Sequence, residues 1–190
     1  MSLQSIMIVG VGGQGTLLTS RIIGNVAINQ GYDVKMSEVH GMAQRGGSVV
    51  TFVKYGEKIY SPVIEKGSAD IILAFEELEA ARWLPYLKED GLLILNTQKI
   101  DPMPVITGTM KYPEDLLLKI GEKVRNFITL DALVLAKEAG TIKAVNVVLI
   151  GVMARNSGIS KEEWIKALEA TVPAKFLEMN MKAFELGFNK

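Results

Sequence analysis

The sequence predicts an α/β fold with three layers, a mostly parallel (mixed) sheet and a helical C-terminal third. Apolar runs of strand length alternate with amphipathic stretches of helix length, which is the pattern of layered α/β proteins. The first apolar run leads into a glycine-rich loop that opens a helix, and the last third has helical periodicity almost throughout.

The first half of the chain supplies the elements around that glycine loop. In order, we expect a strand over 6–9, the loop over 10–15, a helix over 16–30, a short strand over 33–36, a polar loop over 37–47 and a β-branched strand over 48–55. Gly31 ends the helix. Gly56 and Glu57 could close a hairpin onto residues 58–60, which would make the sheet mixed.

The second half continues the alternation and then becomes helical. We expect strands over 70–74, 91–95 and 127–130, a helix over 76–88 interrupted near Pro85, an irregular stretch over 97–113, and helices at about 131–139, 143–156, 160–170 and 174–186. Ser160 and Glu163 have the spacing of a capping box, and Pro173 separates the last two helices. We find no repeat or linker and expect one domain over residues 1–190.

Composition excludes several classes of function. Lys and Arg total 21 and so do Asp and Glu, so no basic excess exists to bind nucleic acid. The sequence contains no run of about 18 apolar residues, the length that a membrane-spanning helix needs. The N-terminus has neither the basic start nor the long apolar stretch of a signal peptide. We therefore expect a cytoplasmic protein.

Thiol chemistry and metal sites built from cysteines or several histidines are excluded by residue counts. The chain has no cysteine and a single histidine, His40. It can form no disulfide, thiolate zinc site or Cys-ligated iron–sulfur cluster, and no multi-histidine metal site. We predict no metal ligands and no catalytic residue, because no serine has a recognisable nucleophile setting.

The glycine loop, Gly10-Val11-Gly12-Gly13-Gln14-Gly15, fits the G-x-G-x-x-G pattern of Rossmann-like folds and lies between a strand and a helix. Its glycines and the following Thr16 would bring backbone N–H groups close to a phosphate. A dinucleotide site also needs an acid at the end of the second strand. Asp33 starts that strand and Glu38 lies past its end, so neither is well placed. The loop is either a cofactor-binding turn, formed by Gly10, Gly12, Gly13, Gln14, Gly15 and Thr16, or a structural one.

The segment 38–48 is the second candidate site. It lacks hydrophobic periodicity, and it should lie at the sheet edge where the glycine loop lies. Arg45 could bind a phosphate or carboxylate, and Gln44 and His40 could donate hydrogen bonds beside it. The alternative is a rigid interface loop with a salt bridge from Glu38 to Arg45.

These motifs resemble a known family. The glycine loop with Thr16-Leu17-Leu18, and above all the run from Glu38 through Gly41-Met42-Ala43-Gln44-Arg45-Gly46-Gly47 to Val49, resemble gamma-type subunits of 2-oxoacid:ferredoxin oxidoreductases. Within them, the resemblance is to the indolepyruvate type. It continues in order through 60–62, 74–80, 146–151 and 180–187, nearly the whole chain.

The resemblance implies an activity that is shared with a larger chain. Such enzymes oxidatively decarboxylate an aryl pyruvate with coenzyme A to aryl-acetyl-CoA, CO2 and reduced ferredoxin. Thiamine diphosphate and [4Fe–4S] clusters belong to the large alpha subunit, so this chain would bind no cofactor alone. Three hypotheses stay open: a non-catalytic small subunit whose glycine-loop rim faces the partner's active site, a free-standing dinucleotide oxidoreductase, and a purely structural subunit.

Overall fold

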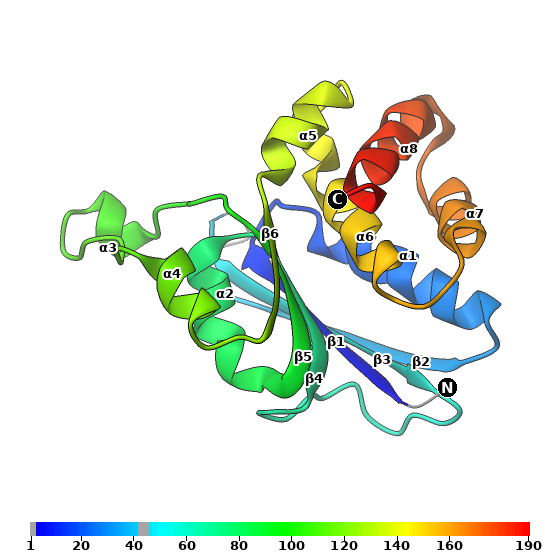
Figure 1. The fold of residues 1–190 in the computed structure, drawn as a ribbon, viewed down its shortest axis with the longest axis horizontal. Coiled ribbons are helices and arrows are strands. Elements are labelled where there is room, and N and C mark those ends of the chain that lie inside the picture. Colours follow the sequence, from blue (N-terminus) through cyan, green and yellow to red (C-terminus); the bar gives the residue numbers. More distant parts are fainter. Residues whose placement is uncertain (1–2, 42–45) are drawn as a thin grey trace.

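A computed structural model describes residues 3–41 and 46–190, and these form one six-stranded sheet with helices on both faces (Figure 1). The strands are β1 (Gln4–Val11), β2 (Asp33–His40), β3 (Ser48–Gly56), β4 (Ala69–Ala74), β5 (Leu87–Asn96) and β6 (Asn126–Leu130). Their order is β2-β3-β1-β4-β5-β6. Among them, β3 alone runs opposite to the other five, so it pairs antiparallel with both β2 and β1, and the remaining pairs are parallel. The predicted mostly parallel, mixed sheet is confirmed.

Helices cover the two faces unequally. Their bounds are α1 (Thr16–Asn29), α2 (Glu77–Trp83), α3 (Met103–Ile106), α4 (Leu116–Gly121), α5 (Ala132–Glu138), α6 (Val145–Arg155), α7 (Lys161–Thr171) and α8 (Ala174–Phe188). One apolar core joins a sheet face to α1 and α5–α8, and a smaller one joins the other face to α2 and α4. The helical C-terminal third therefore packs on one side, as Figure 1 shows.

The central strand explains the three layers. Ile6 and Ile8 point into the larger core, Met7 and Val9 point into the smaller one, and all four are fully buried. Alternate side chains of a strand point to opposite faces. A strand buried on both faces must be apolar at every position, as in sheets with two helical layers.

The second strand is longer than predicted, and the strand over 48–55 pairs with it rather than with residues 58–60. β2 runs to His40 and pairs with β3 from Asp33–Gly56 to His40–Val49. The expected hairpin from Gly56 onto residues 58–60 is wrong, because residues 58–60 form no strand. Instead, β3 lies between β2 and β1 and pairs with both. Polar residues 37–40 resemble a loop in sequence but form an edge strand, whose side chains need no burial.

The middle of the chain also departs from expectation. α2 ends at Trp83, a 3-10 turn spans Leu84–Tyr86, and β5 already begins at Leu87. The stretch expected to be irregular contains α3, a helix of one turn. Helix α4, which follows it, was not predicted. Ser160 does precede α7, but its side chain makes no capping bond there.

Glycines set the contact between α6 and α8. A Cβ on Gly187 would overlap the carbonyl oxygen of Val148, and a Cβ on Gly151 would overlap that of Phe184. The two helix backbones therefore touch directly. Only glycine permits this approach.

Candidate functional site

The glycine loop lies at the carboxyl end of β1, and its glycines have different roles. A Cβ on Gly10 would lie 2.6 Å from Oε1 of Gln14 and 3.0 Å from Cβ of Phe75. Gly13 and Gly15 have positive φ angles of 99° and 86°, which side chains disfavour. The sharp turn from β1 into α1 therefore requires glycine at these positions.

Gln14 braces the loop from inside. Its Oε1 accepts a hydrogen bond from the backbone N–H of Val11 (2.8 Å), and its Nε2 donates to the carbonyl of Phe75 (3.2 Å) and to Oε1 of Gln98 (3.3 Å). The side-chain amide is thus used within the protein. The predicted ligand residue Gln14 lies in the loop, but its polar atoms hold the loop's shape.

Helix α1 opens at this loop without a side-chain cap in the described part of the chain. Gly15 is its N-cap residue. The first N–H groups of a helix have no partner inside the helix, and with the dipole they favour an anion. The loop thus presents uncapped donors at the sheet edge.

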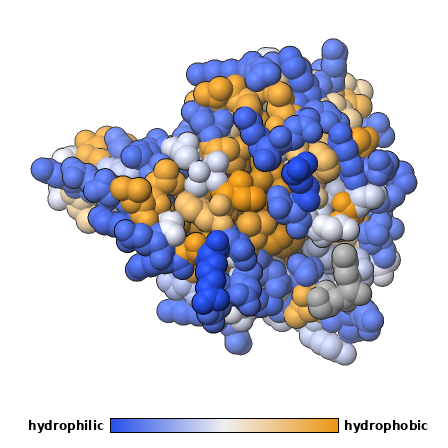
Figure 2. Space-filling model, viewed as in Figure 1, coloured by the Kyte–Doolittle hydropathy of each residue, from blue (hydrophilic) through white to orange (hydrophobic). Residues whose placement is uncertain are grey.

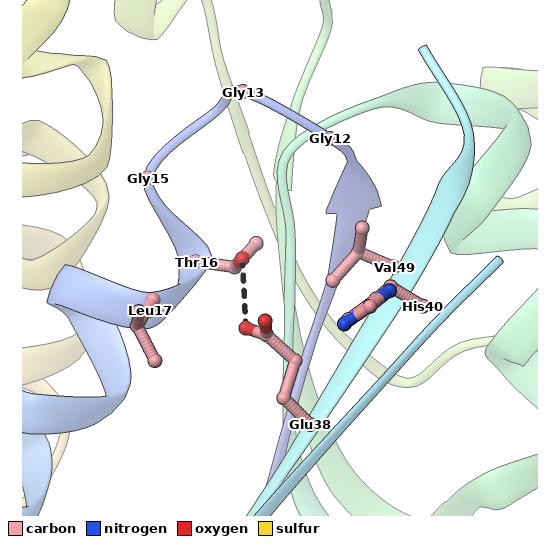
Figure 3. Close-up of a pocket in the computed structure, with 8 residues that line it drawn as sticks. All are labelled: Gly12, Gly13, Gly15, Thr16, Leu17, Glu38, His40 and Val49. Carbon is pink, nitrogen blue, oxygen red and sulfur yellow. Dashed lines mark hydrogen bonds between the residues drawn. The ribbon is translucent and has the colours of Figure 1, made fainter. Parts of the chain in front are cut away.

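A cavity of about 260 Å³ opens on one side of the loop (Figure 3). It is lined by Gly12, Gly13, Gly15, Thr16, Leu17, Glu38, His40 and Val49. Figure 3 shows Thr16 and Glu38 pointing toward one another across it. Sequence reasoning had set Glu38 aside, yet the length of β2 carries it into this cavity.

The carboxylate of Glu38 lies near the start of α1. Its Oε2 accepts from Oγ1 of Thr16 (3.4 Å) and Oγ1 of Thr51 (3.1 Å). A carboxylate at a helix N-terminus is electrostatically favourable. It would also repel a phosphate inside this cavity, whereas it could accept a hydrogen bond from a hydroxyl group.

A larger cavity, about 430 Å³, opens on the other side of the same loop. Its lining residues are Gly13, Gln14, Gly15, Gln98, Leu133, Ile142, Lys143 and Val145. Three apolar side chains form a wall, and Lys143 adds an exposed ammonium. Sequence reasoning missed Gln98 and Lys143. Gln98 could have been found, because it follows a parallel strand at its carboxyl end.

Gly46 and Gly47, the described residues just before β3, lie beside the glycine loop, as predicted for the segment 38–48. The N–H of Gly12 donates to the carbonyl of Gly47 (2.8 Å), and the N–H of Gly46 donates to that of Gly12 (3.4 Å). His40 is exposed, and its Nδ1 lies 3.2 Å from the carbonyl oxygen of Gly41. Gln44 and Arg45 lie outside the described residues, as does the alternative salt bridge to Arg45.

One buried polar atom next to the glycine loop has no hydrogen-bond partner among the described residues. Asn146 is buried at the start of α6, and its Nδ2 donates to the carbonyl of Gly15 (3.5 Å). Its Oδ1 has no partner among the described residues. Side-chain amides buried without full pairing are uncommon.

Nearly the whole chain, including the site, is similar to known proteins. A family model described as pyruvate ferredoxin/flavodoxin oxidoreductase matches residues 5–190. The chain belongs to this family. The match spans both cavities, and it confirms the predicted resemblance to gamma-type subunits of 2-oxoacid:ferredoxin oxidoreductases.

Members of this oxidoreductase family differ in their sequence identity to this chain. Over 96% of its length the chain is 44% identical to indolepyruvate oxidoreductase subunit IorB of Thermococcus kodakarensis, and it covers 93% of that protein. Over 95% of its length it is 27% identical to the pyruvate/ketoisovalerate oxidoreductases common subunit gamma of Pyrococcus abyssi, of which it covers 93%. The solved gamma subunit of a keto/oxoacid ferredoxin oxidoreductase from Geobacter sulfurreducens PCA matches with a TM-score of 0.73 and 27% identity, over 98% of this chain and 96% of that one.

The chain is therefore a small subunit of a 2-oxoacid:ferredoxin oxidoreductase, as the sequence motifs indicated. Residues 3–41 and 46–190 hold no group of three or more His, Asp or Glu side chains placed to bind a metal ion. No helix in those residues is long and apolar enough to cross a membrane.

Proposed function

We propose that this chain is the small subunit of an indolepyruvate (aryl 2-oxoacid):ferredoxin oxidoreductase, acting in the cytoplasm as one domain. The complex would oxidatively decarboxylate aryl pyruvates with coenzyme A to aryl-acetyl-CoA, CO2 and reduced ferredoxin. The observation that carries the substrate class is the gap in identity: 44% to an indolepyruvate oxidoreductase subunit against 27% to a pyruvate/ketoisovalerate gamma subunit.

The redox groups would lie on the large alpha subunit. Iron–sulfur clusters require cysteine thiolates, and this chain contains no cysteine. Its residues do not fit a [4Fe–4S] cluster, and we assign thiamine diphosphate and the clusters to the partner. Ferredoxin would exchange electrons with the complex through that partner.

The contribution of this chain would be to hold coenzyme A at the rim of the sheet. The uncapped start of α1, the ammonium of Lys143 and the guanidinium of Arg45 suit its phosphates. The apolar wall of the larger cavity suits the pantetheine chain. Glu38 suits a ribose hydroxyl rather than a phosphate.

A second candidate, binding of a free dinucleotide, is favoured by one observation. Glu38 shares a cavity with the glycine loop, as the ribose-binding acid of such sites does. However, β3 lies between β2 and β1, so the acid is one strand farther from the loop than in the usual arrangement. A purely structural subunit is the third candidate, in which neither cavity binds a small molecule.

Steady-state kinetics on the assembled complex test the proposal. We expect Arg45→Ala and Lys143→Ala each to raise the KM for coenzyme A about tenfold or more, because a charge-assisted bond contributes roughly 1.5–3 kcal/mol. Arg45→Lys should restore part of the loss. Lys66→Ala is the matched control, since Lys66 is exposed and precedes β4 at the opposite edge of the sheet.

Each alternative predicts a different result. Unchanged kinetics in both variants would favour a structural subunit. Micromolar binding of NAD or NADP to the isolated chain, measured by calorimetry, would favour the dinucleotide candidate.

A further inference from the structure

A short segment projects from the body of the molecule. Residues 101–115, here called the arm, leave the sheet after β5, include α3 and return to α4 (Figure 1). Three large apolar side chains on it are about two-thirds exposed: Met103 (65%), Ile106 (65%) and Met110 (64%). Figure 2 shows hydrophobic residues gathered on this projection.

The tip of the arm carries no charge. From Pro102 to Met110 the sequence contains only proline, methionine, valine, isoleucine, threonine and glycine. An exposed stretch of this kind is costly to keep in water, and exposed apolar patches mark interaction sites. Charged residues return only toward the base, at Asp101, Lys111, Glu114 and Asp115.

The tip is held in shape by its own polar groups. Oγ1 of Thr107 donates to the carbonyl of Met103 (3.0 Å), and Oγ1 of Thr109 donates to that of Pro104 (2.9 Å). The N–H of Met110 also donates to the carbonyl of Pro104 (3.0 Å). The apolar side chains are therefore presented on an ordered turn, so little conformational entropy is lost when they bind.

One buried carboxylate clamps both ends of the arm to the body. Glu76 is 1% exposed, and its Oε1 accepts from the N–H of Ile100 (3.1 Å) and from the hydroxyl of Tyr112. Its Oε2 caps α2 through the N–H of Glu79 (2.9 Å). Glu76 lies two residues after the end of β4, so the arm starts from the same edge of the sheet as the glycine loop.

We infer that the arm is a docking element that inserts its apolar tip into a groove on the large subunit. This rests on the proposed function for the existence of that partner. Position favours the large subunit over a second copy of this chain, because the arm starts at the same end of the sheet as the glycine-loop rim, where the complex would hold coenzyme A. The arm has 15 residues, whereas a stable interface uses roughly 20–30 residues on each side. The arm must therefore act together with a further surface, and the adjoining glycine-loop rim supplies one.

Assembly of the full-length chain with its large subunit tests this inference. We expect Met103→Gln/Ile106→Gln to weaken the complex at least tenfold, measured as the dissociation constant by calorimetry. The melting temperature of the free subunit should be unchanged, because both side chains are exposed. Met103→Leu/Ile106→Leu should bind like the wild type, because the tip stays apolar, and the unchanged melting temperature of the Gln variant excludes misfolding as the cause.

The matched control is Ile28→Gln/Val63→Gln. Both side chains are exposed to a similar degree (57% and 59%), and both lie toward the opposite edge of the sheet, so this variant should assemble normally. If the wild type assembles and the arm variant binds equally well, the inference is wrong while the proposed function stands. If the wild type forms no complex with the large subunit, both are wrong. If the free chain is a dimer that the arm variant dissociates, the arm joins two copies and the inference is again wrong.

Discussion

Gly13 and Gly15 lie two residues apart in the glycine loop, and their surroundings differ. Both have positive φ angles. A Cβ on Gly13 would meet no described atom within 4 Å, whereas a Cβ on Gly15 would lie 2.8 Å from Nδ2 of Asn146. Gly15 is therefore constrained by conformation and by contact, and Gly13 by conformation alone.

This difference predicts unequal costs of substitution. Gly13→Ala should lower the free energy of unfolding by about 1–2 kcal/mol, the cost of a left-handed non-glycine residue. Gly15→Ala should lower it further, by an amount that Asn146→Ala partly restores in the double mutant. Urea denaturation of the wild type, Gly15→Ala, Asn146→Ala and the double mutant would measure this coupling. Strict additivity of Gly15→Ala and Asn146→Ala would contradict the contact.

Two phenols, one buried and one half-buried, should titrate late. Burial raises the pKa of Tyr55 to about 12. Burial, together with the hydrogen bond to the Glu76 carboxylate, raises the pKa of Tyr112 above its ordinary range. An unfolded tyrosine ionises near about pH 10, so both neutral phenols stabilise the fold below that pH. This stabilisation is lost as the pH rises from about 10 through the higher folded-state values.

Ultraviolet absorbance of tyrosinate in the folded protein would detect this. Of the five tyrosines, Tyr55 and Tyr112 should ionise last, and each should disappear from the late phase in its phenylalanine variant. Titration of all five in one step, with the protein still folded, would contradict the burial of both phenols.

At the scale of elements, two contacts position the site. The start of α6 packs on the glycine loop and places Asn146 against Gly15, and the pairing of β2 with β3 places Glu38 against Thr16. The residues of these two side-chain contacts are 131 and 22 positions apart in the sequence. Both cavities thus depend on packing between residues that are not close in sequence.

The backbone contact between α6 and α8 gives a sharp prediction. Gly187→Ala should destabilise the protein by about 3 kcal/mol or more, because its Cβ would overlap the backbone of α6 and the helices must separate. The control is Gly121→Ala in α4, whose nearest atom is the Phe127 ring at 3.5 Å. It should be neutral or stabilise by up to about 1 kcal/mol. Equal denaturation midpoints for both variants would contradict the close approach.

At the scale of the whole molecule, the glycine loop, both cavities and the base of the arm share one edge of the sheet. The carboxyl ends of parallel strands meet there, and helices that follow them begin there. The net charge is zero, and the tip of the arm is uncharged. Apolar contact should therefore dominate assembly with the large subunit.

Salt dependence of assembly checks this. Between about 0.1 M and about 1 M salt the Debye length falls from about 10 Å to about 3 Å. We expect the dissociation constant of the complex to change less than about threefold over that range. A tenfold weakening in high salt would indicate an interface held mainly by ion pairs.

Features that depend on local sequence were predictable. The apolar run before Gly10 and the glycines after it predicted the strand, the turn and α1, because these depend on neighbours in the chain. The C-terminal helices followed from their periodicity. The family could be recognised for the same reason, since its motifs are contiguous stretches such as Glu38 to Val49.

Features that depend on partners were decided only by the tertiary structure. Residues 37–40 have no apolar pattern, and they form a strand because β3 pairs with them. Glu38, Gln98 and Lys143 come from separate parts of the chain, and the order of the strands and the packing of the helices on the sheet bring them around one loop. The sequence by itself determined the fold class and the family. The site's geometry comes from pairing and packing between distant segments, which no local pattern encodes.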